Sequence, residues 1–491
     1  MAGLVKQTAV LTAARFANYG LMLISPIILV RLLSVEQFGQ YRQFILYASF
    51  LQLVAAFSFA DGLLYFIPTR PRSVWRIVGQ TAVLVACSSA AVVILLAVAD
   101  LLIPGRLVGA DLLPLVAYVM CFVNLDFWEC YFLATHRPAA VFWYSTVRLL
   151  GRMTLVVLLA YNAAGVRTII WSLVLLEAVR LMGSALAWKR ADRSADEPPL
   201  GSLWRDQLRY CVPTGIAMLL FMANRNLGGF SVSRSLGTSA LAHYTIGTYA
   251  DYVYLALGNS IAAALLPEMV RRLAHSKQDA LKLWQRVTVV NCMLLLPAAA
   301  ILARFATPII LTVFGQNYRP AVLVLQIHML FLVRACLDFS PAVRALNNTR
   351  PLIYSNVAAL IVNMVALAAL LPRFGIVGAV SALVISSFVE AAVLGWNAMR
   401  MYNSKISEFI PWLSVGKVIA AALAAGAVVA APSWFDAHGL YGVFVAACIY
   451  YLVFAVVLRI LRVGEAAELL HQLQAWIVPL LRTERSADSV K

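Results

Sequence analysis

Charged residues are scarce in this chain. Of its 491 residues only 12% are Asp, Glu, Lys or Arg, whereas 62% are hydrophobic. Soluble globular domains carry about 25% charged residues, so this chain has too few to cover a water-exposed surface of its size. Apolar segments of about 20 residues, the length needed to cross a bilayer, recur from end to end. The sequence therefore predicts an all-α polytopic membrane protein.

Catalytic and metal-binding motifs are also missing. The seven cysteines form no CxxC pair and no metal-ligand spacing, which is typical of buried free thiols. The sequence contains no HExxH, no GxSxG and no phosphate-binding glycine loop. No loop between the apolar segments is long enough to form a soluble catalytic domain. We therefore expect neither an enzyme nor a bound metal or cofactor, apart from a coupling ion considered below.

Acidic residues are outnumbered, since 22 Asp and Glu face 39 Lys and Arg and give a net charge of +17. The cations are spread over short loops at the predicted membrane edges rather than gathered in a basic domain. Membrane topology and anionic lipid headgroups explain such a distribution, so we expect membrane lipids and no nucleic acid among the partners.

About fourteen apolar segments are predicted to span the membrane. An even number places both termini on one side, and the loops on that side hold most of the cations. By the positive-inside rule, both termini are expected in the cytoplasm. The segments lie roughly at 9–30, 41–63, 77–99, 112–134, 140–161, 168–188, 209–231, 242–266, 287–314, 320–343, 352–372, 376–398, 411–432 and 438–460.

A polar loop at 189–208 separates two halves with the same topology. At an offset of about 200 residues, Arg31, Leu33 and Tyr41 recur as Arg234, Leu236 and Tyr244, and parallel repeats of this kind usually hold a substrate site between them. The predicted division is an N-lobe of six spans at 1–188, a cytoplasmic linker at 189–208, a C-lobe of six spans at 209–400, two further spans at 401–462, and an interfacial amphipathic tail at 463–491.

Four stretches resemble a known family. They are RLLSVEQFGQYRQF after the first span, LLPEMVRRLA at the end of the eighth, ATPIILTVFGQNYRPAVLVLQI between the ninth and tenth, and LPRFGIVGAVSALVISSFVE between the eleventh and twelfth. In this order they resemble the bacterial oligosaccharide flippases. These form the polysaccharide transporter branch of the multidrug/oligosaccharidyl-lipid/polysaccharide exporter superfamily.

The resemblance implies two lobes around a V-shaped cavity that opens alternately inward and outward. It implies an inner-membrane protein of bacteria, working as a monomer. The implied substrate is an undecaprenyl-diphosphate-linked oligosaccharide for O-antigen, capsule or exopolysaccharide synthesis, with polysaccharide polymerase machinery as a further partner. The chain lacks the arginine-bearing opening signature of lipid II flippases, which places it with the polysaccharide group.

Arginine is the side chain best suited to a diphosphate, because its guanidinium stays charged and can hold phosphate oxygens in a fork. In the family that the chain resembles, spans one, two, seven and eight line the cavity. This selects Arg15, Arg42 and Arg225, with Asp251 as the acidic counterpart. Arg15 lies near the start of its span and could instead extend to the inner headgroups.

The other arginines within spans admit both structural and functional interpretations. Arg148 and Arg152 share a face of one span; they could extend a cationic path, or pair with Asp126 and Glu129 of the preceding span. Glu177 and Arg180 are three residues apart and Arg334 and Asp338 four, spacings that favour ion pairs on one helix face. Arg334 also remains a candidate for the cavity.

A coupling ion, either H⁺ or Na⁺, would need a carboxylate at membrane depth. The candidates are Asp251, Asp338 and Glu390, each of which could equally be a hydrogen-bonded contact between helices. The main rival function is a multidrug antiporter of the same superfamily that exports organic cations. Such a transporter should line its cavity with acidic and aromatic residues, whereas spans one and seven here offer arginines. A scaffold without transport is a weaker alternative.

Overall fold

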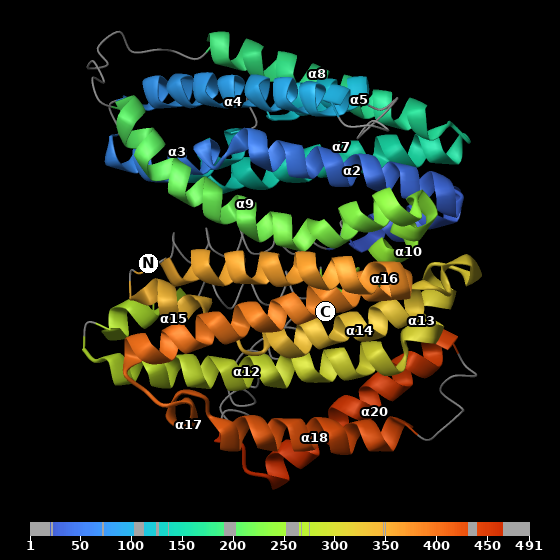
Figure 1. The fold of residues 1–491 in the computed structure, drawn as a ribbon, viewed down its shortest axis with the longest axis vertical. Helices are drawn as coiled ribbons and strands as arrows, with labels where there is room; N and C mark the ends of the chain where they lie inside the picture. The colour runs from blue at the N-terminus through green and yellow to red at the C-terminus, as the bar shows by residue number, and fades with distance from the viewer. Residues whose placement is uncertain are drawn as a thin grey trace, which may run out of the picture. The chain divides into compact units, whose positions relative to one another are not determined.

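The computed structural model describes residues 20, 23–70, 73–102, 112–123, 127–135, 137–190, 203–251, 265–266, 268–273, 275–346, 348, 350–430 and 439–464. These residues form helices joined by turns and caps, with no β-strand among them (Figure 1). The prediction of an all-α fold is therefore confirmed.

The chain divides into two compact units. Unit 1 comprises residues 1–246 and 359–383, and unit 2 comprises residues 247–358 and 384–491. The helix α16 contributes residues to both units. The lobe boundaries proposed from the sequence stay a prediction.

Unit 1 is a bundle in which α2 packs against α4, α5, α8 and α9. The start of α2 is fixed by a capping box. In it, Ser34 Oγ accepts from the Gln37 amide at 3.2 Å, and Gln37 Oε1 accepts from the Ser34 amide at 3.0 Å. The helices are α2 (Val35–Ala56), α3 (Phe59–Thr69), α4 (Val74–Leu102), α5 (Leu112–Val123), α6 (Trp128–Ala134), α7 (Pro138–Tyr161), α8 (Val166–Arg190), α9 (Leu203–Leu236) and α10 (Thr238–Gly247).

Unit 2 packs α12 against α14 and α18, and α20 against α13 and α18. At one end of α12, Trp284 stacks on Phe339 and lies 4.8 Å from the ring of Phe409, and its indole N–H donates to the Asp338 carbonyl at 2.8 Å. The helices are α12 (Lys277–Arg304), α13 (Ala306–Val313), η3 (Gln316–Tyr318), α14 (Ala321–Ala335), α15 (Ser340–Ala345), α17 (Ile406–Phe409), α18 (Trp412–Ala430) and α20 (Gly439–Ile460), with part of α16 (Arg350–Tyr402).

Nine helices in the described ranges are long and apolar enough to cross a membrane, and helical segments match the described parts of the predicted spans. The second predicted span, 41–63, is not one straight helix. Phe57 and Ser58 both have positive φ angles, 41° and 57°, and end α2 before α3 begins. Two successive left-handed residues that are not glycine are uncommon, and no proline or glycine in the sequence indicates this break.

The two predicted spans 352–372 and 376–398 form one continuous stretch, α16, with a sharp reversal inside it. Gly375 adopts φ 57° and ψ −135°, a conformation that side chains other than glycine rarely tolerate. Beyond it, Gly378 lies so close to the Leu370 carbonyl that a Cβ would overlap it. In a straight helix these residues would be about 12 Å apart, so the chain folds back here and the two spans are separate, as predicted.

We predict that Gly378→Ala destabilises the protein by roughly 1–3 kcal/mol, the usual cost of forcing extra volume into a packed site. The backbone of Leu370 cannot move away without opening the reversal. The measurement is thermal unfolding of the purified protein in detergent. Gly416→Ala is the matched control, because a Cβ there meets no atom within 4 Å; an equal loss in both variants would contradict the prediction.

Candidate substrate-binding site

Arg180 of α8 has a partner for each of its three guanidinium nitrogens. Its Nε donates to Glu177 Oε2 at 2.6 Å, its Nη1 to the Tyr144 hydroxyl at 2.7 Å, and its Nη2 to the Phe122 carbonyl at 2.8 Å. Phe122 is in the last turn of α5, where main-chain carbonyls have no partner within the helix and attract a cation. The predicted Glu177–Arg180 pair is confirmed, and it joins α5, α7 and α8.

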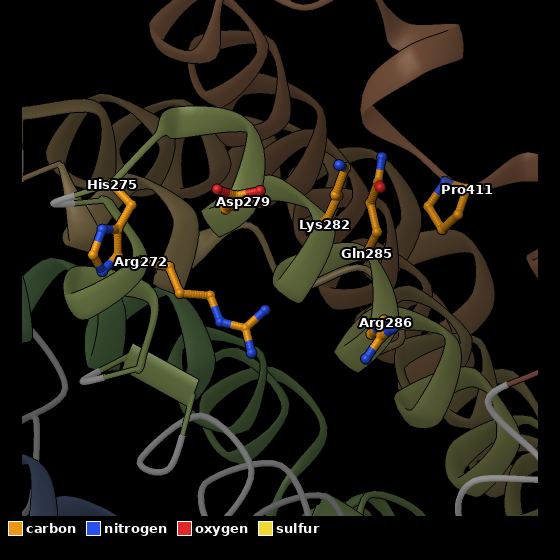
Figure 2. Close-up of a pocket in the computed structure, with 7 residues that line it drawn as sticks. All are labelled: Arg272, His275, Asp279, Lys282, Gln285, Arg286 and Pro411. Atoms are coloured by element: carbon orange, nitrogen blue, oxygen red, sulfur yellow. The ribbon is translucent and has the colours of Figure 1, made fainter.

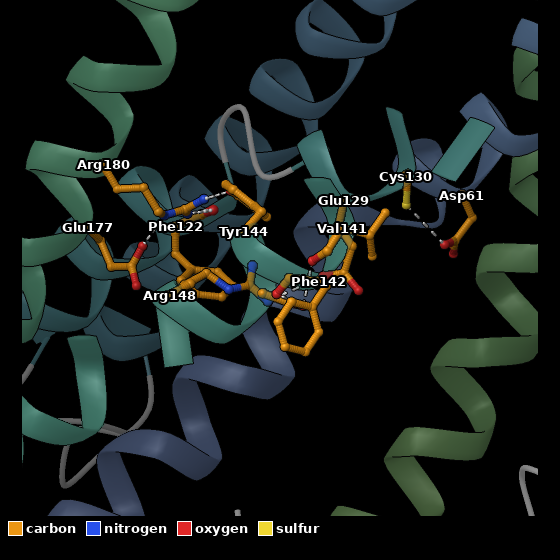
Figure 3. A network of polar contacts seen from close by, with 11 residues as sticks. Asp61, Phe122, Glu129, Cys130, Val141, Phe142, Tyr144, Arg148, Glu177 and Arg180 are labelled. Carbon is orange, nitrogen blue, oxygen red and sulfur yellow. Dashed lines mark hydrogen bonds and ion pairs between the residues drawn. The ribbon is translucent and has the colours of Figure 1, made fainter. Parts of the chain in front are cut away.

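Arg148, on the neighbouring helix α7, forms a longer ion pair. Its Nη2 lies 3.6 Å from Glu129 Oε2, an ion pair longer than a hydrogen bond. Its guanidinium also lies 5.7 Å from the ring centre of Phe122 and 5.6 Å from that of Tyr144. Figure 3 shows Arg148 between the Glu177–Arg180 pair and Glu129. The predicted pairing of Arg148 with Glu129 is confirmed, while Asp126 lies outside the described residues.

Arg152 completes this group of arginines, which we call the unit 1 network: Arg148, Arg152 and Arg180 with Glu129 and Glu177. Its guanidinium interacts with the Tyr41 hydroxyl and with Glu177, and lies 5.9 Å from the ring centre of Tyr118. Its cation therefore meets an aromatic ring and a carboxylate. The network thus surrounds its cations with carboxylates and rings, and this lowers the cost of holding them at membrane depth.

Arg42 lies outside this network, on α2 between two residues with assigned partners. Tyr41 contacts Arg152, and Gln43 Nε2 donates to Ser233 Oγ of α9 at 2.8 Å. The Nε of Arg42 is buried and has no hydrogen-bond partner among the described residues. A buried donor left without an acceptor costs about 1–3 kcal/mol, and an anionic ligand or a water molecule that accepted from this Nε would remove that cost.

Arg225 of α9 lies 5.9 Å from the ring centre of Phe221. The asparagines beside it are both used structurally. Asn363 Nδ2 of α16 donates to Asn224 Oδ1 at 2.8 Å, and Asn226 Nδ2 donates to the Met222 carbonyl at 2.9 Å. Successive helical residues point about 100° apart, so Arg225 faces a different direction from Asn224. Arg15 lies outside the described residues.

In unit 2, the predicted pair of Arg334 with Asp338 is wrong. Arg334 Nη2 lies 3.1 Å from Glu390 Oε2, and its Nε donates to the Ser387 carbonyl at 2.9 Å. The helix α14 ends at Ala335, so a spacing of four residues no longer places Asp338 on the same face. Asp338 Oδ1 accepts from the Ser340 amide at 2.9 Å instead.

Asp251, also in unit 2, has a partner that the sequence did not indicate. Its Oδ1 lies 2.8 Å from Nε2 of His328 on α14. His328 is 0% exposed, stacks on Phe331, and has no partner for Nδ1 among the described residues. A histidine inside the apolar run LQIHMLFLV was the signal that could have found this pair. In the described part of the chain, no group of three or more metal-ligating side chains gathers.

Comparison with known proteins decides the family. A family model described as "Polysaccharide biosynthesis protein" matches residues 28–323, which is more than half of the chain. The chain belongs to the polysaccharide biosynthesis protein family. The resemblance inferred from the four sequence stretches is thereby confirmed. A search of curated protein sequences finds no match.

Solved structures with the same fold as this polysaccharide biosynthesis family member are membrane transporters. The structure "Lipid II flippase MurJ, inward closed conformation" matches with a TM-score of 0.69 at 14% identity, covering 92% of this chain and 99% of that one. A multidrug resistance MATE family transporter of the MOP superfamily matches with a TM-score of 0.55 at 16% identity, covering 80% and 98%. A Vibrio cholerae MATE transporter matches with a TM-score of 0.52 at 14% identity, covering 83% and 98%. The family member therefore has the fold of this superfamily and is a multi-span membrane protein.

We predict that Arg180→Gln destabilises this family member by about 3–5 kcal/mol, because the 2% exposed Glu177 then loses its hydrogen-bonded ion-pair partner. The double variant Arg180→Gln/Glu177→Gln removes both charges and should recover most of the loss. Thermal unfolding in detergent checks both. Arg148→Gln is the control, since its longer contact to Glu129 should matter less. A double variant no more stable than Arg180→Gln would contradict the ion-pair interpretation.

Proposed function

We propose that this protein is a flippase for a lipid-linked oligosaccharide and not an enzyme. It would move an undecaprenyl-diphosphate-linked oligosaccharide from the cytoplasmic to the outer leaflet of a bacterial inner membrane by alternating access. Its product would serve O-antigen, capsule or exopolysaccharide synthesis. Family membership supports the pathway, and the likeness to a structure named as a lipid II flippase is compatible with a lipid-linked substrate. Both termini would lie in the cytoplasm, and the working form would be a monomer.

This proposal rests on the surroundings of Arg42. Its buried Nε has no acceptor among the described residues, whereas Arg180 and Arg334 meet carboxylates. A diphosphate oxygen would supply the acceptor that Arg42 lacks, and a guanidinium binds phosphate more strongly than a neutral donor does. Arg225 and Arg15 are proposed to act with it. Arg148, Arg152 and Arg334 stay weaker candidates, because each already has partners within its unit.

A multidrug antiporter is the alternative, and the likeness to MATE transporters is compatible with it. An organic cation needs free carboxylates and rings at membrane depth. In unit 1 the described carboxylates of the network already face arginines. Within this network the charge therefore favours an anionic substrate; Asp61 of α3, which accepts from Cys130 Sγ at 4.0 Å, lies outside it.

The first test is transport of a fluorescent undecaprenyl-diphosphate oligosaccharide in proteoliposomes. Arg42→Gln should lower the flipping rate by about tenfold or more, because a hydrogen bond to a charged group contributes about 1.5–3 kcal/mol and about 1.4 kcal/mol is a factor of ten. Arg42→Lys keeps the charge without the fork and should fall between. Arg225→Gln and Arg15→Gln are measured alongside.

Arg304→Gln is the matched control, because Arg304 lies at the end of α12, where it donates to the Ala430 carbonyl at 3.4 Å and lies 4.9 Å from the ring centre of Phe305. If all variants move the lipid-linked oligosaccharide as fast as the wild type does, the protein moves lipids through another site. If the wild type moves no lipid but exports organic cations, the antiporter function replaces the flippase.

We further propose that the Asp251–His328 pair couples transport to protons. Histidine is the side chain whose charge changes most readily near neutral pH, and a neighbouring carboxylate gives its proton an acceptor. The helix α14, which carries His328, packs against α12 and α13. The charged groups on these helices are Arg334, which Glu390 neutralises, and five residues near the ends of α12: Lys277, Asp279, Lys282, Arg286 and Arg304. Among the candidates, Glu390 and Asp338 are occupied by the contacts described above, so Asp251 is the strongest.

An imposed proton gradient should accelerate flipping by the wild type, and His328→Gln and Asp251→Asn should each lose this response while still binding substrate. His243→Gln, which alters a half-buried histidine of α10 in unit 1, should respond as the wild type does. The measurement is the flipping rate in proteoliposomes with and without the gradient, and with sodium in place of it. A normal proton response in both variants would exclude the pair as the coupling site.

A further inference from the structure

A cationic pocket lies at the start of α12 in unit 2. It has a volume of about 490 Å³ and is lined by Arg272, His275, Asp279, Lys282, Gln285, Arg286 and Pro411. Figure 2 shows these side chains along the beginning of α12, with His275 at one end and Pro411 at the other. Such a volume is ample for a phosphate headgroup, since ligand pockets commonly measure about 300–1,000 Å³.

The helix spacing explains why the charges converge. Asp279, Lys282 and Arg286 are separated by three and four residues, which places them on one face of α12. Asp279 Oδ2 accepts from the Ser276 hydroxyl at 2.8 Å and so belongs to the start of the helix. Three cations then face a single carboxylate in the pocket wall, and the pocket is positively charged overall.

The cations differ in how far they are engaged. Arg272 Nε donates to Glu268 Oε1 at 3.0 Å, and hydrogen bonds from Arg272 and Arg271 hold the pKa of the Glu268 carboxyl below its usual range. Glu268 therefore remains ionised and anchors the Nε edge of Arg272. The contacts of Arg272 in the described structure involve Nε alone, and Lys282 has no partner among the described residues. Both can donate to a ligand.

The opposite wall of the pocket is fixed in place. Gln285 Nε2 donates to the carbonyls of Glu408 and Phe409, at 2.7 and 3.0 Å, and so ties α12 to α17. Phe409 is fully buried and packs 4.8 Å from Trp284. The helix α12 and the segment of α17 that carry this wall are therefore tied together.

The surroundings point to a lipid rather than to a soluble phosphate. Directly after Pro411, Trp412 and Leu413 are 52% and 76% exposed, and exposed tryptophan marks the headgroup level of a membrane. Farther along α12 the chain is apolar and long enough to span the bilayer. By the positive-inside rule this end of α12 is the predicted cytoplasmic end. Basic pockets at this level bind anionic headgroups.

We propose that this pocket binds the phosphate headgroup of an anionic lipid in the cytoplasmic leaflet. Arg272, Lys282 and Arg286 would hold the phosphate, and Trp412 and Leu413 would contact the first carbons of the chains. If the proposed flippase function holds, the same chemistry would let the pocket retain the polyprenyl diphosphate before transport. The binding itself does not depend on that function.

The test is native mass spectrometry of the full-length protein released from nanodiscs of phosphatidylcholine with phosphatidic acid. Lys282→Gln/Arg286→Gln should weaken phosphatidic acid binding by about tenfold or more, given about 1.5–3 kcal/mol for each hydrogen bond to a charged group. Arg344→Gln/Arg459→Gln removes the same charge from exposed positions elsewhere in unit 2 and should bind as the wild type does. Thermal unfolding of each variant confirms that it is folded.

Three results would overturn the proposal. Equal loss in the two double variants would mean that total charge, not the pocket, attracts the lipid. Unchanged binding in Lys282→Gln/Arg286→Gln would place the lipid elsewhere. If inorganic diphosphate bound as tightly as the lipid and displaced all of it, the pocket would be a site for a soluble phosphate. Because binding is measured without transport, its failure is distinguishable from a failure to flip.

Discussion

The cost of placing a charge in hydrocarbon governs the polar contacts of this protein. Even on the lenient scale, an arginine at the centre of a bilayer costs at least about 2.5 kcal/mol. Arg180 and Arg334 meet this cost in the same way, although they belong to different units. Each joins a carboxylate and a main-chain carbonyl of a neighbouring helix. For Arg334 the neutralising contact with Glu390 also joins two helices, α14 and α16. For Arg180 the ion pair lies within α8, and the contacts to the Phe122 carbonyl and the Tyr144 hydroxyl join it to α5 and α7.

Arg42 differs from Arg180 and Arg334, which both meet carboxylates. Locally consistent proteins satisfy their buried polar groups, and departures concentrate at functional or strained positions. Arg42 departs in that its Nε is buried without an acceptor among the described residues, while its neighbours Tyr41 and Gln43 are engaged. The residue therefore needs a partner that the described protein does not supply. An anion or a water molecule would meet that need.

The sequence predicted what depends on local pattern and missed what depends on distant contacts. Long apolar runs placed the helices, and the turn at Gly375 between two such runs follows from the need for each span to be about 20 residues long. The break at Phe57 and Ser58 has no such signal. The Glu177–Arg180 pair was predictable because both residues lie within one helix. The Arg334–Glu390 and His328–Asp251 contacts join residues 56 and 77 positions apart, and no periodicity reports such pairs.

The aromatic rings of unit 1 also bear on whether the substrate is an anion or a cation. In unit 1, Phe122 faces both Arg148 and Arg180, Tyr118 faces Arg152, and Phe221 faces Arg225. Each contact uses the electron-rich ring face that an organic cation would need. A cationic drug would have to displace a tethered guanidinium from such a ring and then lie beside the guanidinium it displaced. These ring contacts therefore support the proposal of an anionic substrate over that of an organic cation.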